Sequence, residues 1–291
     1  MPDITLCSMV YDNNEYLFLQ EKVCRKLAQF DYNRLIIDCN VNQKDSNSLQ
    51  EIPNTEIVDG KWINNYSGSQ AHGIAVNKML DYVNTKYCII LDLDVLPLCK
   101  KWDAEVIEEL NSGIDIVGVP YNPLHEGRRI LNIPTAFFMA FRTDKIKRAK
   151  LEWRTYPPFV RLRMYWFYRK LNRYIFKTNS PKLFDFEMGH LALTKIKLKR
   201  MKVRNFDMVQ PWDSKSKLNF DTSYLPVDKS KIDPLNDIYP EEWHFNGKPF
   251  LTHQRKSRKS AKSYNRIISA NWFDIVRNYL IDNYKIDIDE I

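Results

Sequence analysis

Short apolar runs alternate with longer helical patterns through the first part of this chain. The apolar runs, several of them rich in β-branched residues, occupy positions 4–10, 35–37, 55–58, 88–91 and 114–119. Between them, apolar residues recur at helical spacing over positions 15–30 and 67–83. A helix between two strands carries the chain back across the sheet, so that successive strands can run parallel. The alternation therefore predicts an α/β fold with a mostly parallel sheet flanked by helices.

The remainder of the chain carries a different pattern. The segments with a clear signal are a strand at 135–142, a helix at 186–196, a hairpin around Asn246-Gly247 at 243–252 and an amphipathic helix at 265–281. Positions 210–240 are polar and without periodicity, which indicates a loop. We expect one domain over residues 1–260, with halves at 1–120 and 121–260, and a helical extension over 261–291.

Charge and cysteine content indicate which partners and which cellular compartment suit this protein. The net charge is +8 and the isoelectric point is about 9.1, which favours nucleotide phosphates, nucleic acid or an anionic membrane as partners. The five cysteines are odd in number and none has zinc-ligand spacing, so we expect reduced core thiols. No run approaches the ~20 apolar residues of a membrane span, and the first residues lack the basic segment of a signal peptide. These features predict a cytoplasmic protein.

Two carboxylates follow the most apolar of the predicted strands. The sequence YCIILDLDVLP, at 87–97, places Asp92 and Asp94 directly after a buried strand. Ligands of open α/β sheets bind beyond the carboxyl ends of the strands. One carboxylate can ligate a divalent cation directly, and the other can bind through water or contact the ribose of a nucleotide. Oxygen ligands suit Mg²⁺ or Mn²⁺, which also bind diphosphate oxygens.

The segment 67–94 resembles the GT-A nucleotide-sugar glycosyltransferases, and its pattern is similar to that of their large inverting family. In that family a helix of Gly-x-Ala-x-Asn character precedes a strand that ends in Leu-Asp-x-Asp. Here Gly73, Ala75 and Asn77 have that spacing, and Asp92 and Asp94 follow. The resemblance covers roughly residues 3–200, and is weakest over 40–66 and after 150.

The resemblance implies both a fold and an activity. The fold would be GT-A, with a Rossmann-like nucleotide-sugar-binding half at 1–120 and an acceptor half at 121–260. The activity would be Mn²⁺- or Mg²⁺-dependent transfer of a sugar from a nucleotide sugar, a UDP-sugar foremost, to an acceptor hydroxyl on a glycan or glycolipid. Inverting and retaining stereochemistry both stay open.

Further donor contacts follow from the resemblance, residue by residue. After the first strand, Tyr11 would stack on the base and Asp12 would accept from uracil or ribose. Asp12 could equally cap the next helix. Asp38, after the second strand, matches another nucleotide contact or is a turn residue. Asn77 and Asp92 complete the expected donor contacts.

The resemblance also places a catalytic base on a later helix. Inverting transfer needs a carboxylate that takes the proton from the attacking hydroxyl. Asp185 and Glu187 form the acid pair with apolar flanks in the right region. Their Asp-x-Glu order departs from the Glu-Asp pair usual in the family. Asp185 could instead cap the following helix, with Glu187 in its first turn.

A third metal ligand in this fold often comes from a C-terminal histidine. His253 follows a predicted strand and opens the basic run RKSRKSAK. Arg255, Lys256 and Lys259 would then neutralise the leaving nucleoside diphosphate. His244 is a rival ligand, and a solvated surface tail is the alternative for the basic run.

The segment 161–177 is rich in basic and aromatic residues and has no acidic one. As a helix it could lie on an anionic membrane that holds a lipid-linked acceptor, or grip a nucleic-acid backbone. It could also pack its rings on the core and leave its cations in solvent. Two other functions therefore stay open: a glycosyltransferase that acts on modified bases of DNA, and a non-enzymatic basic nucleic-acid-binding protein.

Overall fold

The computed structural model describes a seven-stranded sheet. It covers residues 3–11, 13–66, 68–120, 133–155, 160, 163, 189–223, 227–228, 239–254 and 264–287, without the side chains of 64, 68, 69, 190 and 264–270. The sheet has the strand order β3-β2-β1-β4-β7-β6-β8. The strands are β1 (Ile4–Val10), β2 (Asn33–Asp38), β3 (Thr55–Asp59), β4 (Tyr87–Leu91), β6 (Ile116–Gly118), β7 (Phe138–Arg142) and β8 (Val203–Asn205). Strands β1 to β4 pair in parallel, and β7 is antiparallel to both of its neighbours. The expected α/β fold with a mostly parallel sheet is confirmed.

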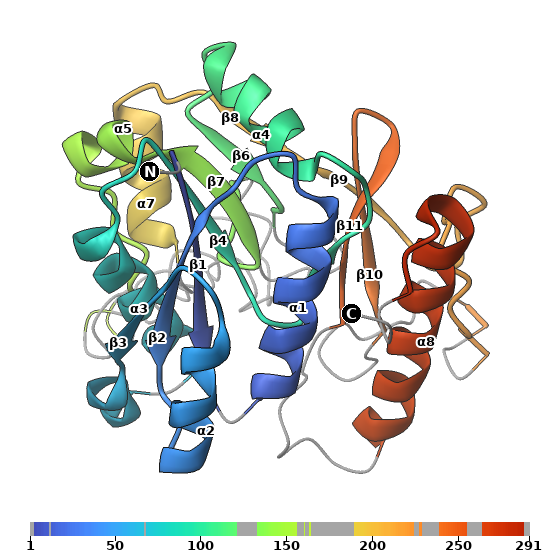
Figure 1. Ribbon diagram of the computed structural model, residues 1–291. Helices are drawn as coiled ribbons and strands as arrows, with labels where there is room; N and C mark the ends of the chain where they lie inside the picture. Colours follow the sequence, from blue (N-terminus) through green and yellow to red (C-terminus); the bar gives the residue numbers. More distant parts are fainter. Residues whose placement is uncertain are drawn as a thin grey trace.

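Helices cover both faces of this sheet (Figure 1). One face packs against α1 (Asn14–Leu27) and α4 (Trp102–Asn111). The helix α8 (Tyr264–Tyr284) lies beyond α1, where its Phe273 contacts Tyr16 and its Trp272 donates to Thr252. The other face packs against α3 (Gly68–Tyr82), α5 (Thr143–Ala149) and α7 (His190–Leu198). Alternate residues of each strand supply the two cores: Leu6 belongs to the first and Cys7 to the second. The short helices α2 (Gln43–Ser48), η1 (Leu49–Glu51) and η2 (Lys61–Asn65) lie in the connections around β3.

A second, four-stranded antiparallel sheet lies beside the first. Its order is β5-β11-β10-β9, with β5 at Val95–Pro97, β9 at Asp207–Val209, β10 at Glu241–Phe245 and β11 at Lys248–His253. The predicted hairpin is confirmed, because Asn246 and Gly247 have φ values of 50° and 75° and join β10 to β11. Strand β5 begins one residue after Asp94 and pairs with β11, opposite His253. This pairing brings two distant parts of the chain to one place.

Several elements were not anticipated from the sequence. They are α2, α4, α5, β5, β8 and β9. The three strands among them have three residues each, too few for a period-two pattern to be recognised. The predicted helix at 186–196 is observed from His190 onward, and residues 186–188 lie outside the described part of the chain.

All five cysteines are free and buried, which confirms the expected core thiols. Burial, for example, raises the pKa of Cys39 to about 12. Among the described helices, none combines the length and the apolar character needed to cross a membrane.

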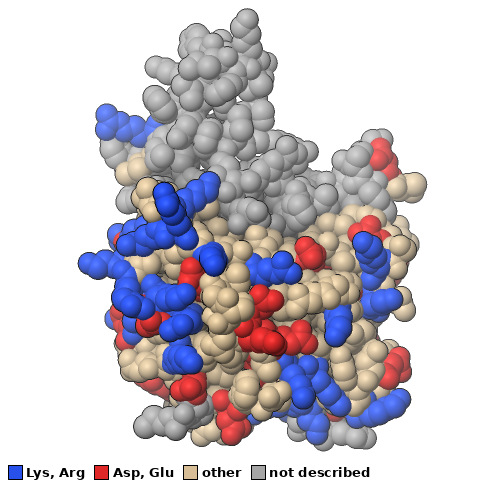
Figure 2. All heavy atoms as spheres, turned by 90° about the horizontal axis from the view of Figure 1, so that it is seen from above, with Lys and Arg blue, Asp and Glu red and all other residues tan. Residues whose placement is uncertain are grey.

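Part of the positive charge gathers at the amino ends of β1, β2 and β4. Viewed from above that edge, Lys and Arg side chains collect over α5 and α7 (Figure 2). Some are neutralised locally, since Lys145 pairs with Asp115 and Lys195 lies 3.0 Å from Glu152. This basic surface is at the edge opposite to the one that carries Asp92 and Asp94.

Candidate metal and donor site

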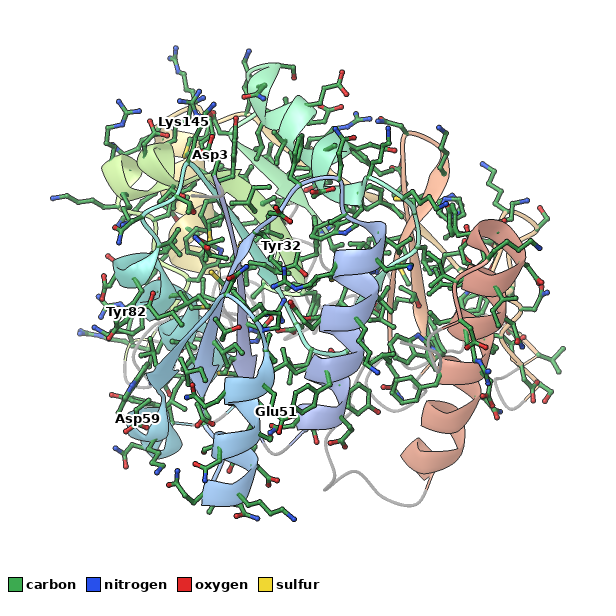
Figure 3. The ribbon with its side chains drawn as sticks, in the orientation of Figure 1. Asp3, Tyr32, Glu51, Asp59, Tyr82 and Lys145 are labelled. Carbon is green, nitrogen blue, oxygen red and sulfur yellow. The ribbon has the colours of Figure 1, made fainter. Side chains whose placement is uncertain are left out.

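The loops after β1, β2 and β4 meet at one edge of the sheet. In Figure 3, Asp3 marks the amino edge and Asp59, which ends β3, marks the carboxyl edge. The loops after β1 and β2 are joined there, because the backbone N–H of Cys39 donates to the carbonyl of Val10 at 2.9 Å. The structure therefore brings the predicted donor residues Tyr11 and Asp38 to the same edge as the Asp92-Leu93-Asp94 segment.

The two nucleotide contacts expected at this edge differ in exposure. Tyr11 is 40% exposed, so its ring is accessible to a base. Asp38 is buried, and its Oδ1 accepts from the backbone N–H of Asn40 at 3.0 Å. This bond is the contact expected if Asp38 is a turn residue at the end of β2. It uses one carboxylate oxygen, and the turn does not use the other. The donor roles of both residues stay predictions.

Asp92 to Val95 form a turn that one internal hydrogen bond closes and two backbone hydrogen bonds hold from outside. The N–H of Asp92 donates to Phe137 O at 3.0 Å, and the N–H of Val95 donates back to Asp92 O at 3.2 Å. The carbonyl of Asp94 accepts from the N–H of Gln254 at 2.9 Å. The backbone of both carboxylates is thus fixed by neighbouring elements, which is what a preorganised ligand site requires.

His253 faces Asp94 across the boundary between the two sheets. Its Nε2 lies 3.4 Å from Asp94 Oδ1, and its Nδ1 lies 3.0 Å from Oε2 of the buried Glu241. Burial lowers the pKa of His253, but the two facing carboxylates outweigh burial and raise the pKa to about 10. The ring also contacts Phe137, with 4.6 Å between centroids. The carboxylates of Asp94 and Glu241 therefore favour a positive charge at His253.

These residues fit a divalent cation. A carboxylate and an imidazole nitrogen face one another, and the other ring nitrogen is held by a second carboxylate, the usual support of a metal-binding histidine. Within the described residues, no three His, Cys, Asp or Glu side chains form one ligand group. Asp94 and His253 would therefore supply two ligands. Diphosphate oxygens and water would complete the shell, as is usual for Mg²⁺ beside phosphates.

Asp92 has a partner that sequence reasoning missed. His72, on α3, places its Nε2 3.0 Å from Asp92 Oδ1. Asp92 is only partly buried, so its carboxylate stays accessible at the edge of the sheet. The sequence around His72 gives no sign of this contact, because the contact depends on how α3 packs beside the end of β4.

The Gly-x-Ala-x-Asn pattern on α3 has a packing role in the structure. A Cβ at Gly73 would lie 2.4 Å from the carbonyl oxygen of Trp153, so only glycine permits this approach. Asn77 Oδ1 accepts from the N–H of Trp153 at 2.9 Å. A groove of about 720 Å³ beside Asn77 includes neither Asp92 nor Asp94 among its described lining. The donor contact predicted for Asn77 stays a prediction.

Several other candidates lie outside the described residues: Asp12, Asp185, Glu187, Arg255, Lys256, Lys259 and nearly all of 161–177. The rival ligand His244 lies on the face of β10 opposite to Glu241. Its Nε2 is 2.6 Å from Oε1 of Glu242. Glu242 in turn accepts from the backbone N–H groups of Lys217 and Leu218, so this pair anchors a loop.

Comparison with known proteins gives matches among solved structures. No family model matches the sequence. A search of curated proteins gives no match either. The structure is similar to an active-site variant of LgtC, with a TM-score of 0.46 and 10% identity over 93% of this chain and 95% of that chain.

It is also similar to the mannosyltransferase PcManGT from Pyrobaculum calidifontis in complex with GDP-Man and Mn²⁺. There the TM-score is 0.44 and the identity 12%, over 70% of this chain and 54% of that chain. For mouse xyloside xylosyltransferase 1 the TM-score is 0.42 and the identity 14%, over 70% of this chain and 85% of that chain.

The chain spans about half the length of the mannosyltransferase, and 30% of that of the S. aureus protein TarS. PcManGT and the mouse protein are glycosyltransferases by name, and LgtC is named a galactosyltransferase. At these identities the similarity describes fold alone, and activity is inferred from the site residues.

Proposed function

We propose that this protein is a metal-dependent glycosyltransferase that moves a sugar from a nucleoside-diphosphate sugar, a UDP-sugar foremost, to an acceptor hydroxyl. One observation carries the proposal. At the carboxyl edge of the sheet, Asp94 faces His253 at 3.4 Å, and Glu241 holds the far side of the imidazole. This arrangement suits a divalent cation next to the place where α/β sheets bind nucleotides.

The residues at this edge would have separate roles in binding the metal and the donor. Asp94 and His253 would hold Mn²⁺ or Mg²⁺, which when bound neutralises charge on the departing diphosphate. Asp92, partly buried beside them, would meet the ribose or a metal-bound water. Tyr11 would stack on the base and Asp38 would accept from the nucleoside. The strands that precede Tyr11, Asp38 and Asp92 end at one edge of the sheet, and His253 faces Asp94 there.

The acceptor side rests on expectations from sequence. Asp185 or Glu187 would take the proton from the attacking hydroxyl, and Arg255, Lys256 and Lys259 would bind the leaving diphosphate. We propose a glycan or glycolipid acceptor in the cytoplasm or at a membrane surface, met through 161–177. Binding of duplex DNA with a steep salt dependence would instead favour the DNA acceptor.

The proposed activity can be tested without knowledge of the acceptor. Purified protein is incubated with UDP-sugars and Mn²⁺, and release of UDP is measured with and without excess EDTA. We expect slow release that requires metal and is lost in Asp94→Asn. Asp115→Asn, whose carboxylate pairs with Lys145 at the opposite edge, is the matched control and should retain release. Equal release by wild type and Asp94→Asn, or full release in EDTA, would contradict the proposal.

A further inference from the structure

A buried amide lies directly beneath the Asp92–Val95 turn. Gln20, on α1, is fully buried, and its Nε2 donates to Asp92 O at 2.5 Å and to Val95 O at 2.9 Å. One side chain therefore spans the first and last residues of the turn that carries both carboxylates. Because the two carbonyls are acceptors, only the NH₂ end of the amide can make these bonds.

Arg34, on β2, determines which way that amide points. Its Nη2 donates to Gln20 Oε1 at 2.5 Å and to Ser8 Oγ at 2.8 Å. A guanidinium has no acceptor atom, so the oxygen of Gln20 must face Arg34 and its NH₂ must face the turn. Ser8 Oγ in turn donates to Leu91 O at 2.6 Å. Both branches from Arg34 thus end on backbone carbonyls at or just before the turn.

Stability alone does not account for Arg34. The side chain is fully buried, yet its nearest carboxylate contact, from Nη1 to Glu21 Oε2, is 3.6 Å long. Among the residues that the structure describes, its Nε and Nη1 have no hydrogen-bond partner. Glu21 is shared with Arg25 and with the hydroxyl of Tyr32, which Figure 3 labels close to α1. A buried, partly satisfied charge is costly, and apolar side chains often replace such charges without loss of stability.

We infer that Gln20 and Arg34 are positioning residues for the metal site. Through the turn, the pair fixes the direction in which Asp94 faces His253, although neither side chain touches the metal or the substrate. Without the clamp, the carbonyls of Asp92 and Val95 lose their common donor and the turn gains freedom. Displacements of about 1 Å are enough to weaken a ligand site. This inference rests on the proposed metal site.

The test compares Mn²⁺ affinity, measured by calorimetry in the presence of UDP, between wild type and two sets of variants. Gln20→Glu keeps the length of the side chain and a partner for Arg34, but turns a carboxylate oxygen toward the two carbonyls. We expect Mn²⁺ affinity to fall by at least about tenfold, the scale of supporting contacts behind metal ligands. Arg34→Met should cause a similar loss, whereas Arg34→Lys keeps a donor for Gln20 and should recover part of the affinity.

Asp103→Asn is the matched control. Asp103 is a buried carboxylate that fixes a different turn, since it accepts from the N–H groups of Gln29 and Phe30 at 2.8 Å each. All variants are measured below their melting temperatures, as followed by circular dichroism. We expect Asp103→Asn to lower the melting temperature and leave Mn²⁺ affinity unchanged. A variant defective only in folding would behave like this control.

The outcomes separate the two proposals. If wild type binds Mn²⁺ with UDP and the Gln20 and Arg34 variants bind equally well, the positioning role is refuted and the proposed function stands. If wild type shows no Mn²⁺ binding with UDP, the proposed metal site fails and this inference fails with it. Should Gln20→Glu not fold, the contrast between Arg34→Lys and Arg34→Met decides the question.

Discussion

Glu241→Gln tests whether the carboxylate behind His253 supports a metal ligand. Glu241 is buried on β10, and its Oε2 lies 3.0 Å from Nδ1 of His253. Glutamine keeps the size of the side chain and can still accept from Nδ1–H. It removes the negative charge that makes the imidazole a stronger electron donor at Nε2, the atom that faces Asp94.

The magnitude follows from this geometry. Loss of a carboxylate that supports a metal-bound histidine typically lowers metal affinity by about 10- to 100-fold, or roughly 1.4–2.7 kcal/mol. Because glutamine preserves the hydrogen bond, we expect the lower end for Glu241→Gln. Glu241→Leu removes the bond as well, so we expect the upper end for that variant.

Titration of Mn²⁺ into protein with UDP, followed by calorimetry, measures this effect. Glu242→Gln is the control, because Glu242 is the next residue along β10, is equally buried, and points to the loop at Lys217 instead of the site. It should leave Mn²⁺ affinity unchanged. Equal affinities for Glu241→Gln, Glu241→Leu and wild type would refute the reasoning that His253 binds metal with Glu241 behind it.

Three further predictions concern other parts of the molecule. Gly73→Ala gains about 1 kcal/mol of helix propensity but places a Cβ against the backbone of Trp153, so the melting temperature should fall by several degrees. An unchanged melting temperature would show that the backbone of Trp153 moves aside at no cost. Burial raises the pKa of Glu242, but its hydrogen bonds outweigh burial and hold the pKa below the usual range of a glutamate, so the stabilisation is present above that range and lost as pH falls through the lowered pKa. The melting temperature of Glu242→Gln should therefore drop less than that of wild type between about pH 6 and pH 3.5, and equal drops would contradict the assignment. Asp185→Asn or Glu187→Gln should lower turnover about 100-fold with donor affinity retained, and near-normal turnover in both would place the base elsewhere.

The strand-end carboxylates could be predicted from sequence because their signal is local. A buried apolar strand, an abrupt pair of acids and the helix before them all lie within residues 67–94. The hairpin was equally local, since Asn246-Gly247 favours the positive φ values that the turn requires. The signal for α4 was also present: Trp102, Val106 and Leu110 are spaced four apart and all are buried.

The support behind the site could not be predicted, because it depends on contacts between distant elements. His253 reaches Asp94 only because β11 pairs with the three-residue strand β5. In sequence, Gln20 and Arg34 look like an ordinary helical polar residue and a surface cation, and only the packing of α1 against β2 buries them. Periodicity identifies which face is apolar, but it does not show which polar groups are buried and paired.

The most direct test of the metal site is to locate the metal. Crystals grown with MnCl₂ and UDP would be measured at the manganese absorption edge, and an anomalous difference map would be calculated. The structure predicts one strong peak between Asp94 and His253, with Glu241 still on the far side of the imidazole. A manganese peak elsewhere, or bound UDP with no manganese peak beside Asp94, would contradict it.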